Sequence, residues 1–354
     1  MKAARIYGKK DIRIEEIPVP KPNPNEVQIK VGYCGICGSD IHMYEDGFAL
    51  PYKPHPLTGK TVPITEGHEF SGQITKLGSW VEGLKVGDRV AVEPIIACGH
   101  CENCLKGNYN FCTNAIGSDG SANFIGVSDD GGMAQYANVR SWFAHKIPDS
   151  LSYELGALVE PAAVAYEGIK RSGLIEGQTV AVMGAGPIGL MTAVLARIAG
   201  ATKIYIDDVS KPRLAKAKEL GFKNVLNPTE GDVVKEIHKT VPSGVDITFE
   251  CAGAQPTFDT AFEVTKSTGL LQIIALFGKP TTVNLTNFTM KGINIHNTLA
   301  YNNSFPAVID MVNEHQDLFK QFITKKVNLD KAVEAIKALV SDKSQVKILI
   351  SPQS

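Results

Sequence analysis

The sequence predicts an α/β protein of two domains, one rich in β-strands and one built on a doubly wound parallel sheet. The chain has 354 residues, which is longer than a single hydrophobic core usually organises. Short strand-like runs punctuated by glycine and proline fill roughly its first 150 residues. From about Gly168 strand-like and helical segments alternate, as in a parallel sheet covered on both faces. We therefore expect residues 158–296 to form the doubly wound domain, and residues 1–157 and 297–354 to form the other.

The first expected domain contains β-branched or alternating runs, which is the pattern of half-buried strands. After about His296 the alternation of strands and helices stops, and the chain is expected to return to this domain through two helices and a last strand. The expected strands are 26–35 (EVQIKVGYCG), 70–78 (FSGQITKLG), 88–94 (DRVAVEP) and 345–351 (QVKILIS), and the expected helices are 304–315 and 329–342.

The second expected domain alternates short apolar runs with amphipathic segments of helical period. The expected strands lie within 179–186 (TVAVMGAG), 203–208 (KIYIDD), 224–228 (NVLNP), 245–253 (VDITFECAG) and 270–278 (LLQIIALFG). The expected helices lie within 187–200, 211–221, 232–241 and 258–269 (FDTAFEVTKSTG).

The composition argues against several classes of partner. A net charge of -1 gives no reason to expect nucleic acid or an anionic membrane. The uncharged run from Val180 to Ala196 falls short of the roughly 20 residues of a membrane helix, and its glycines and Pro187 divide it into a strand, a turn and a helix. No apolar segment of secretory length opens the chain, so we expect a cytoplasmic protein whose clustered cysteines are metal ligands rather than disulfides.

Four of the seven cysteines fall within residues 98–112, CGHCENCLKGNYNFC. Four thiolates around one ion form a closed tetrahedral site with no position for substrate, which indicates structural zinc. Lys106 is the one positively charged residue of this loop, so a nucleic-acid-binding knuckle is not favoured. The expected ligands are Cys98, Cys101, Cys104 and Cys112.

A second set of candidate ligands occurs in two stretches that we expect to be turns of the first domain, GYCGICGSDIH and ITEGHEFSG. Together they contain Cys37, Ser39, Asp40, His42, His68 and Glu69. Cys37 with the His68–Glu69 pair, each flanked by glycine, favours an open site of mixed ligands. Packed or surface residues are the alternative for each of them alone.

The glycines of GAGPIG, Gly184, Gly186 and Gly189, follow an expected strand and open an expected helix. In this setting the first glycine permits a tight turn, the second lets the backbone approach a pyrophosphate, and the third lets helix and strand pack closely. The next strand ends at Asp208, 19 residues beyond Gly189. A carboxylate there suits the adenosine ribose and repels the 2′-phosphate of NADP, so we expect NAD; Asp207 is the alternative ribose ligand.

These motifs resemble those of the zinc-dependent medium-chain dehydrogenases. GICGSDIH, GHEFSG, the four-cysteine loop, GAGPIG and the closing KILI occur in the order found in that family, and the resemblance covers essentially the whole chain. PHPLTGKTVPITEGHEFSG most resembles the butanediol dehydrogenase branch, which is close to the sorbitol dehydrogenases. The resemblance implies a GroES-like catalytic domain, a Rossmann domain, an active site in the cleft between them, and two zinc ions per chain.

Site roles also follow from the resemblance. It implies that Cys37 and His68 bind the catalytic zinc and that Asp40 fixes a ligand imidazole. Ser39 would take the alcohol proton, which passes by the cofactor ribose to His42. Glu69 would be a ligand that alternates with water or substrate. Simple alcohol dehydrogenases have a second cysteine ligand where this chain has Glu160, as the polyol branch has, so Glu160 is the expected third ligand; which glutamate binds zinc at rest is left open.

The expected reaction is the interconversion of a vicinal secondary diol and its hydroxyketone with NAD(H), in a homodimer or homotetramer. Sorbitol or another polyol is the alternative substrate, and a non-catalytic zinc- and nucleotide-binding protein is the alternative from another class. Phe277 is expected near the nicotinamide, or else as a packed core residue. The residues expected to bind the cofactor are Gly184, Gly186, Pro187, Ile188, Gly189, Asp208, Arg213 and Phe277.

Overall fold

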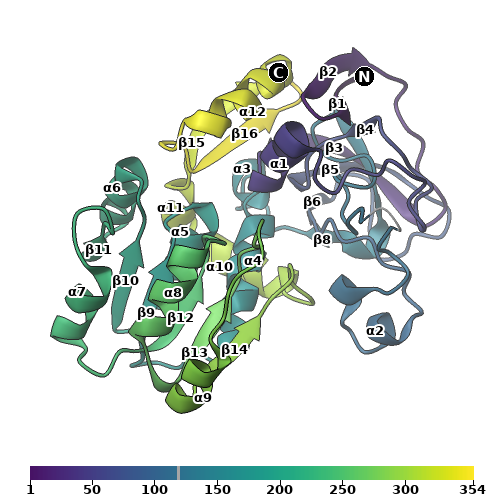
Figure 1. Ribbon diagram of the computed structural model, residues 1–354. Coiled ribbons are helices and arrows are strands. Elements are labelled where there is room, and N and C mark those ends of the chain that lie inside the picture. Colours follow the sequence, from purple (N-terminus) through teal and green to yellow (C-terminus); the bar gives the residue numbers. More distant parts are fainter. Residues whose placement is uncertain (118–119) are drawn as a thin grey trace. The chain divides into compact units, whose positions relative to one another are not determined.

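A computed structural model describes residues 1–117 and 120–354 of the chain (Figure 1). The chain divides into two compact units, which we call the first unit (Met1–Glu160 and Asn302–Ser354) and the second unit (Pro161–Tyr301). Helix α4 (Val159–Ser172) begins in the first unit and continues in the second. In the part of the chain that the structure describes, no helix is long and apolar enough to cross a membrane.

The first unit contains two sheets. One has the strand order β2-β1-β4, and the other has the order β15-β16-β3-β5-β6-β8 with β7 also paired to β3. The C-terminal strand β16 pairs with β3 in antiparallel register, with Leu349 opposite Gly35, so the end of the chain returns to the first unit as expected. The strands are β1 (Lys2–Gly8), β2 (Asp11–Glu16), β3 (Glu26–Gly35), β4 (Ile64–Thr65), β5 (Glu69–Leu77), β6 (Arg89–Val92), β7 (Tyr136–Arg140), β8 (Ala144–Lys146), β15 (Ile323–Asn328) and β16 (Lys347–Ser351).

The helices of the first unit are short or lie near its C-terminal end. One of them corrects an expectation: Ser39, Asp40 and His42 lie on the helix α1 rather than in a turn, because Gly47 in the left-handed conformation (φ 72°) ends the helix only after Asp46. The helices are α1 (Gly38–Asp46), α2 (Glu102–Leu105), α3 (Tyr153–Gly156), α10 (Phe305–Glu314), α11 (Gln316–Lys320) and α12 (Ala332–Ser341), with the 3-10 turns η1 (Tyr109–Phe111), η2 (Ser141–Phe143) and η3 (Leu329–Lys331).

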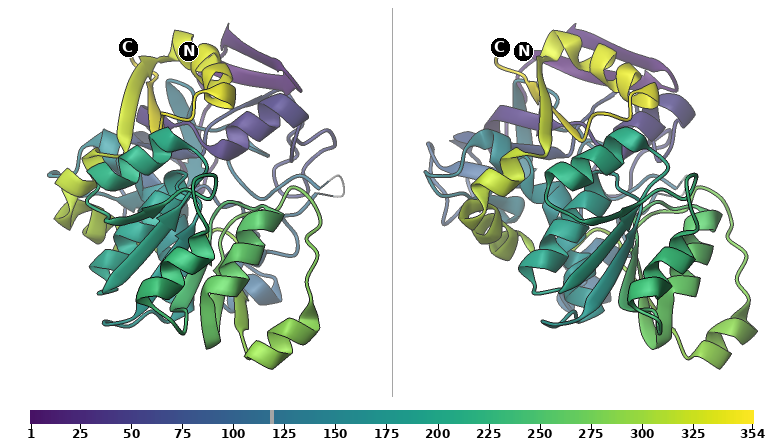
Figure 2. Two further views of the ribbon diagram at one scale, coloured as in Figure 1. Left: turned by 60° about the vertical axis from the view of Figure 1, so that its left-hand side comes forward. Right: turned by 90° about the vertical axis from the view of Figure 1, so that its left-hand side faces the viewer.

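The second unit is a six-stranded parallel sheet of order β11-β10-β9-β12-β13-β14. Helices pack on both of its faces (Figure 2). The strand order reverses between β9 and β12, which is where doubly wound sheets bind ligands. The strands are β9 (Thr179–Met183), β10 (Lys203–Asp207), β11 (Asn224–Leu226), β12 (Val245–Glu250), β13 (Thr265–Ile273) and β14 (Asn294–Asn297); the helices are α5 (Pro187–Ile198), α6 (Lys211–Glu219), α7 (Val233–Thr240), α8 (Gln255–Val264) and α9 (Leu285–Lys291).

Most expected elements of this unit are confirmed, but the segment 258–269 is not one helix. Helix α8 ends at Val264, and β13 begins at the next residue, Thr265, because its backbone pairs with Val245 of β12. Thr268 then takes a positive φ of 63°, which an α-helix does not accommodate. The strand β14 was also missed, since its four exposed residues carry no apolar pattern.

The uncharged run Val180–Ala196 behaves as expected. It begins in β9, turns at Gly184 with a φ of 96°, and continues in α5, where Pro187 occupies the first turn. A proline is tolerated there because the first helical N–H groups have no intrahelical partner.

Candidate active site and metal centres

The first unit brings Cys37, His68 and Glu69 together. One ligand atom from each, a sulfur, an imidazole nitrogen and a carboxylate oxygen, lies within 4.8 Å of the others, and the three can hold a metal ion. Cys37 precedes α1, whereas Glu69 opens β5 and His68 comes just before it. These are the donor types that zinc prefers in sites of mixed ligands.

Asp40 orders this cluster from behind. Its carboxylate is fully buried and accepts a hydrogen bond of 2.7 Å from the backbone N–H of Cys37. The other oxygen, Oδ1, lies 3.7 Å from Nδ1 of His68. Burial raises the pKa of Asp40 to about 6. A carboxylate behind an imidazole in this way fixes which ring nitrogen faces the metal.

The ring of His68 has its other nitrogen on the side of the candidate ligands. Nε2 lies 3.4 Å from Oγ of Ser39. Burial disfavours the imidazolium form, but the negative charges of Cys37 and Asp40 outweigh burial and raise the pKa of His68 well above its ordinary value. Nδ1 of His68 and Oδ1 of Asp40 have no hydrogen-bond partner among the described residues. The crowding of negative charge around one buried imidazole is the arrangement that a cation relieves.

Glu69 is held by a lysine that the sequence gave no reason to single out. Nζ of Lys347, on β16, donates to both carboxylate oxygens of Glu69 at 2.6 and 2.7 Å and to the carbonyl oxygen of Ile36 at 3.0 Å. The side chains of Glu69 and Lys347 are 1% and 2% exposed. Burial lowers the pKa of Lys347, but the charges of Glu69, Cys37 and Glu160 together with the hydrogen bond to Glu69 outweigh it, and the net change is upward. A buried pair with three hydrogen bonds is fully desolvated and correspondingly dependent on both partners.

Glu160 lies at the start of α4 and is 5% exposed. It is not one of the three residues grouped above, but its negative charge is close enough to raise the pKa of His68 and of Lys347, after larger influences from burial and from nearer charges. The structure therefore places both expected glutamates near the imidazole.

Ser39 and His42 share α1 but have different surroundings. Ser39 contacts His68, as described above, whereas His42 is 67% exposed in its side chain and lies 3.7 Å from a carboxylate oxygen of Asp46. The expected proton path from Ser39 to His42 thus starts beside the cluster and ends on an exposed ring.

The four cysteines of residues 98–112 also come together, with ligand atoms within 4.8 Å of one another. Two sulfur–sulfur distances, Cys98 to Cys104 and Cys101 to Cys112, are 3.9 Å. Zinc–sulfur bonds of about 2.3 Å in a tetrahedron place the sulfurs about 3.8 Å apart, so this set fits zinc. All four thiols are free rather than joined in disulfides.

Hydrogen bonds to sulfur favour the thiolate form of Cys98 and Cys101, whereas burial opposes it at Cys104 and Cys112. The backbone N–H groups of Cys98 and Cys101 donate to Cys112 and Cys98 at 3.3 Å. Such bonds, first among them one from the backbone of Cys104, lower the pKa of Cys101 to about 5, whereas burial raises the pKa of Cys104 to about 12. Thiolates are the form that binds metal.

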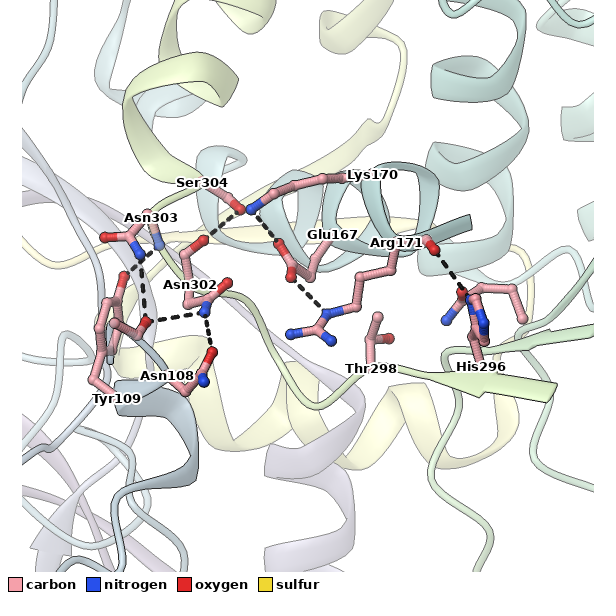
Figure 3. A network of polar contacts seen from close by, with 12 residues as sticks. Asn108, Tyr109, Glu167, Lys170, Arg171, His296, Thr298, Asn302, Asn303 and Ser304 are labelled. Atoms are coloured by element: carbon pink, nitrogen blue, oxygen red, sulfur yellow. Dashed lines mark hydrogen bonds and ion pairs between the residues drawn. The ribbon is translucent and has the colours of Figure 1, made fainter. Parts of the chain in front are cut away.

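A polar network anchors the loop to the rest of the first unit, and Figure 3 shows the part of it that joins Asn108 and Tyr109 to Asn302 and Asn303. The hydroxyl of Tyr109 donates to Oε1 of Glu93 at 2.6 Å and accepts from the backbone N–H of Asn303 at 2.6 Å. The other oxygen of Glu93 contacts Nε2 of His145 at 2.7 Å, and the amide of Asn302 donates to the carbonyl of Gly107 at 2.9 Å. No motif of the sequence pointed to this network, because its members come from four separate segments.

The glycine-rich turn of the second unit has the geometry expected of a dinucleotide site. A Cβ added at Gly189 would lie 1.8 Å from the carbonyl oxygen of Gly184, so only glycine lets the turn and helix approach this closely. A Cβ at Gly186 would meet nothing nearer than 4.0 Å, which leaves the backbone there open to a ligand. Pro187 and Ile188 continue into α5 and are partly exposed.

Asp207, the last residue of β10, and Asp208, which follows it, have different surroundings. Asp208 accepts from the backbone N–H groups of Ala185 at 2.9 Å and Ser210 at 2.8 Å and lies 3.4 Å from the guanidinium of Arg213. Asp207 is 2% exposed and accepts from the N–H of Gly184 at 3.0 Å. Burial raises the pKa of Asp207 to about 7, so this side chain acts as a buried brace of the turn.

Phe277 packs against the hydrophobic core of the second unit, with its ring 6.2 Å from that of Phe258 in an edge-on arrangement. This contact matches the packed-core alternative for Phe277.

Comparison with known proteins identifies the family. Residues 23–149 match the family described as Alcohol dehydrogenase GroES-like domain, and residues 187–314 match Zinc-binding dehydrogenase. The chain belongs to the zinc-dependent medium-chain alcohol dehydrogenase family and is an oxidoreductase. The expected family and the expected fold, a GroES-like domain with a Rossmann-type domain, are confirmed.

Within the family, the chain is similar to butanediol dehydrogenases. It is 42% identical to the (R,R)-butanediol dehydrogenase of Bacillus subtilis over 99% of this chain and 100% of that protein. The crystal structure of 2R,3R-butanediol dehydrogenase from Bacillus subtilis matches with a TM-score of 0.92 at 42% identity and covers 99% of both chains. A sorbitol dehydrogenase of Bacillus subtilis is 36% identical over 99% of this chain and 97% of that protein.

Proposed function

We propose that this enzyme interconverts a vicinal secondary diol, 2,3-butanediol, and its hydroxyketone, acetoin, with NAD(H) as the hydride carrier. The observation that carries the proposal is the cluster of partly buried Cys37 with buried His68 and Glu69. Thiolate, imidazole and carboxylate around one point form a mixed set that leaves room for an oxygen of the substrate. The whole-chain similarity to butanediol dehydrogenases supports the substrate class.

In this proposal Cys37 and His68 hold a zinc ion. A zinc ion held there would supply Lewis acidity, which favours loss of the alcohol proton. Asp40 keeps Nδ1 of His68 on its own side, so that Nε2 faces the ligands. Ser39, whose hydroxyl lies 3.4 Å from Nε2, would accept the alcohol proton and release its own hydroxyl proton by way of the cofactor ribose to His42, from which a proton reaches solvent.

We propose Glu160 as the third protein ligand at rest, with Glu69 as the alternative. Both oxygens of Glu69 are bonded to Lys347, so this lysine competes with a metal ion for the negative charge of Glu69. Glu160 reaches the same region from α4, and its influence on the pKa of His68 supports its proximity. A carboxylate in place of a thiolate makes the site harder.

The second unit, in this proposal, holds the dinucleotide, with the pyrophosphate at Gly184, Gly186 and Gly189 and the adenosine ribose at Asp208. A dinucleotide held there would supply the acceptor for the hydride of the carbinol carbon. Arg213 is paired with Asp208 and is thereby kept from attracting the 2′-phosphate of NADP.

Cofactor choice tests the role of Asp208. We expect Asp208→Ala to raise the ratio of kcat/KM with NADP to kcat/KM with NAD at least about tenfold, which corresponds to about 1.4 kcal/mol, because it removes a negative charge and releases Arg213. Asp208→Asn, which keeps one acceptor oxygen for the backbone N–H groups, separates the charge from the hydrogen bonds. An unchanged ratio in both variants would assign the preference to Asp207 or to another group.

A polyol such as sorbitol is the second candidate substrate, favoured by the similarity to sorbitol dehydrogenases. A panel of the butanediol stereoisomers, sorbitol and threonine, each with NAD, distinguishes the candidates by kcat/KM. Preference for a butanediol supports the proposal, and preference for sorbitol overturns its substrate. A protein that contains zinc and binds NAD but turns over no member of the panel would favour the non-catalytic alternative.

We propose in addition that the protein works in the cytoplasm as a homodimer or homotetramer. The resemblance to the medium-chain family supports the assembly. The net charge of -1 supports small molecules as partners rather than nucleic acid. Sedimentation equilibrium of the purified chain tests the assembly, and a monomer at micromolar concentration would contradict it.

A further inference from the structure

The first unit contains a cavity of about 680 Å³ that no residue of the two metal-ligating clusters lines. Its volume is in the range of sites that hold small molecules. The residues that line it come from the segment 17–26, from β7 and from the chain around Thr58 and Asp129. Four of them are buried apolar residues, Ile95, Ile96, Ile125 and Phe143. The cavity thus combines apolar surface with polar and charged groups.

Two adjacent carboxylates line this cavity, and they differ in their partners. Asp130 is bonded to Lys60 at 2.6 Å and to Arg5 at 3.0 Å, and it accepts from the backbone N–H of Thr65 at 2.8 Å. Asp129 accepts from the backbone N–H of Asp130 at 2.8 Å, and among the described residues no cationic side chain is bonded to it. Burial raises the pKa of Asp129 to about 6, so its carboxylate is mostly ionised at pH 7 and an ammonium group would stabilise it.

Unpaired polar atoms on other side chains of the cavity are a separate indication of a ligand. Thr65 is 1% exposed, and its hydroxyl has no hydrogen-bond partner among the described residues. The same is true of Nε of Arg5 and of Oδ1 of Asn138. Native proteins leave few buried donors and acceptors unpaired. Three of them on residues that line one cavity indicate that polar groups of a bound molecule are accommodated there.

Cations without a carboxylate partner also line the cavity. Arg140, the last residue of β7, donates to the carbonyl oxygen of Ala97. In the part of the chain that the structure describes, neither Arg140 nor Lys21 is paired with a carboxylate. The amide of Asn138 donates to the carbonyl oxygen of Lys21 at 2.8 Å, which holds the segment of Lys21 against β7. The cavity therefore offers an unpaired carboxylate from one segment and unpaired cations from two others.

We propose that this cavity binds a small zwitterion, an amino acid or a short peptide with apolar side chains. The ammonium group is bonded to Asp129, the carboxylate is bonded to Arg140 and Lys21, and the apolar side chains pack on the four buried apolar residues. A ligand with one sign of charge would leave either Asp129 or the two cations facing a like charge. The inference does not depend on the proposed function, because no residue of the metal-ligating clusters takes part.

Titration calorimetry of the purified full-length protein with leucyl-leucine tests the proposal. Two analogues each remove one charge: the N-acetylated peptide lacks the ammonium group, and the C-terminal amide lacks the carboxylate. We expect leucyl-leucine to bind with a Kd below about 1 mM and each analogue to bind at least about tenfold more weakly. These comparisons need no change in the protein, so they do not depend on the folding of a variant.

Variants connect each charge of the ligand to its partner. Asp129→Asn should weaken binding of leucyl-leucine about tenfold and leave the Kd of the acetylated peptide within about twofold, because that peptide has no ammonium group to lose. Arg140→Gln should weaken binding of leucyl-leucine and leave the Kd of the amide within about twofold. Asp149→Asn is the control, since Asp149 is an exposed carboxylate of the same unit that does not line the cavity. It should change none of the Kd values.

Three results would overturn the inference. The first is no saturable binding of leucyl-leucine up to about 10 mM. The second is equal binding of leucyl-leucine and either analogue, which would show that one of the two charges is not recognised. The third is binding that neither Asp129→Asn nor Arg140→Gln weakens, which would place the peptide elsewhere on the protein.

Discussion

The two clusters of metal-ligating residues in the first unit are built in opposite ways. The four cysteines come from one loop of residues 98–112 and are no more than partly buried except for Cys112. The cluster of Cys37, His68 and Glu69 draws on two segments, and Lys347, which holds Glu69, is 278 residues away in the chain. Four cysteine ligands would fill every position around a metal ion in the first cluster. The second cluster has mixed donors, and the buried charge of Glu69 is paired with a lysine from a distant strand. Local sequence is enough to make a structural metal site, but an open site needs the fold.

Removal of a ligand from the mixed cluster should have the largest effect. We expect Cys37→Ala or His68→Ala to lower kcat by about a thousandfold or more, because the several kcal/mol of charge stabilisation that a metal provides are lost. Binding of NADH should persist, since the glycine-rich turn belongs to the second unit. Steady-state kinetics and NADH fluorescence titration measure the two effects, and zinc analysis should fall from two equivalents to one. Appreciable turnover in either variant would refute the assignment of this cluster.

The next largest effect concerns the ion pair behind the mixed cluster. Lys347→Met should lower the free energy of unfolding by about 3–5 kcal/mol, because it leaves the buried carboxylate of Glu69 without its partner. Lys347→Arg tests whether a cation alone suffices, and the double variant Lys347→Met with Glu69→Gln should recover much of the loss. Urea unfolding followed by circular dichroism gives the values. A loss below about 1 kcal/mol for Lys347→Met would contradict this dependence of buried Glu69 on Lys347.

The same contrast explains which parts of the molecule the sequence predicted. Three features depend on residues close together in the chain: the glycine-rich turn, the alternation of strands and helices in the second unit, and the cysteine loop. The structure has the turn and most of these strands and helices at the expected positions, and it brings the four cysteines together. Residues 258–269 were wrongly expected to form one helix because pairing with β12 overrides local helical preference from Thr265 onward. Lys347 was missed because a lysine within a C-terminal strand is ordinarily an exposed residue. Its role exists only once β16 pairs with β3.

The cysteine loop should respond differently from the mixed cluster. Cys104→Ser is expected to reduce the free energy of unfolding by about 2–3 kcal/mol and to remove one zinc equivalent. Intrinsic kcat of the remaining folded protein should stay within about twofold, since a closed site takes no part in the chemistry. Differential scanning calorimetry, zinc analysis and active-site titration check this together. Full stability with loss of activity alone would contradict a structural role for the loop.

The smallest expected effect lies in the anchoring of that loop. The hydroxyl of Tyr109 bridges Oε1 of buried Glu93 and the backbone N–H of Asn303, so Tyr109→Phe removes two hydrogen bonds. Asn303 is exposed and its N–H gains water instead, and Glu93 keeps its contact with His145. The expected loss of unfolding free energy is therefore only about 1 kcal/mol.

The metal site itself should not feel this change, because none of the four sulfurs is touched. Two zinc equivalents should remain in Tyr109→Phe, and a double-mutant cycle with Glu93→Gln should show a coupling of about 1 kcal/mol. Release of zinc from Tyr109→Phe would mean that the shape of the loop depends on contacts outside it. That result would contradict the contrast between the cysteine loop and the cluster of Cys37, His68 and Glu69.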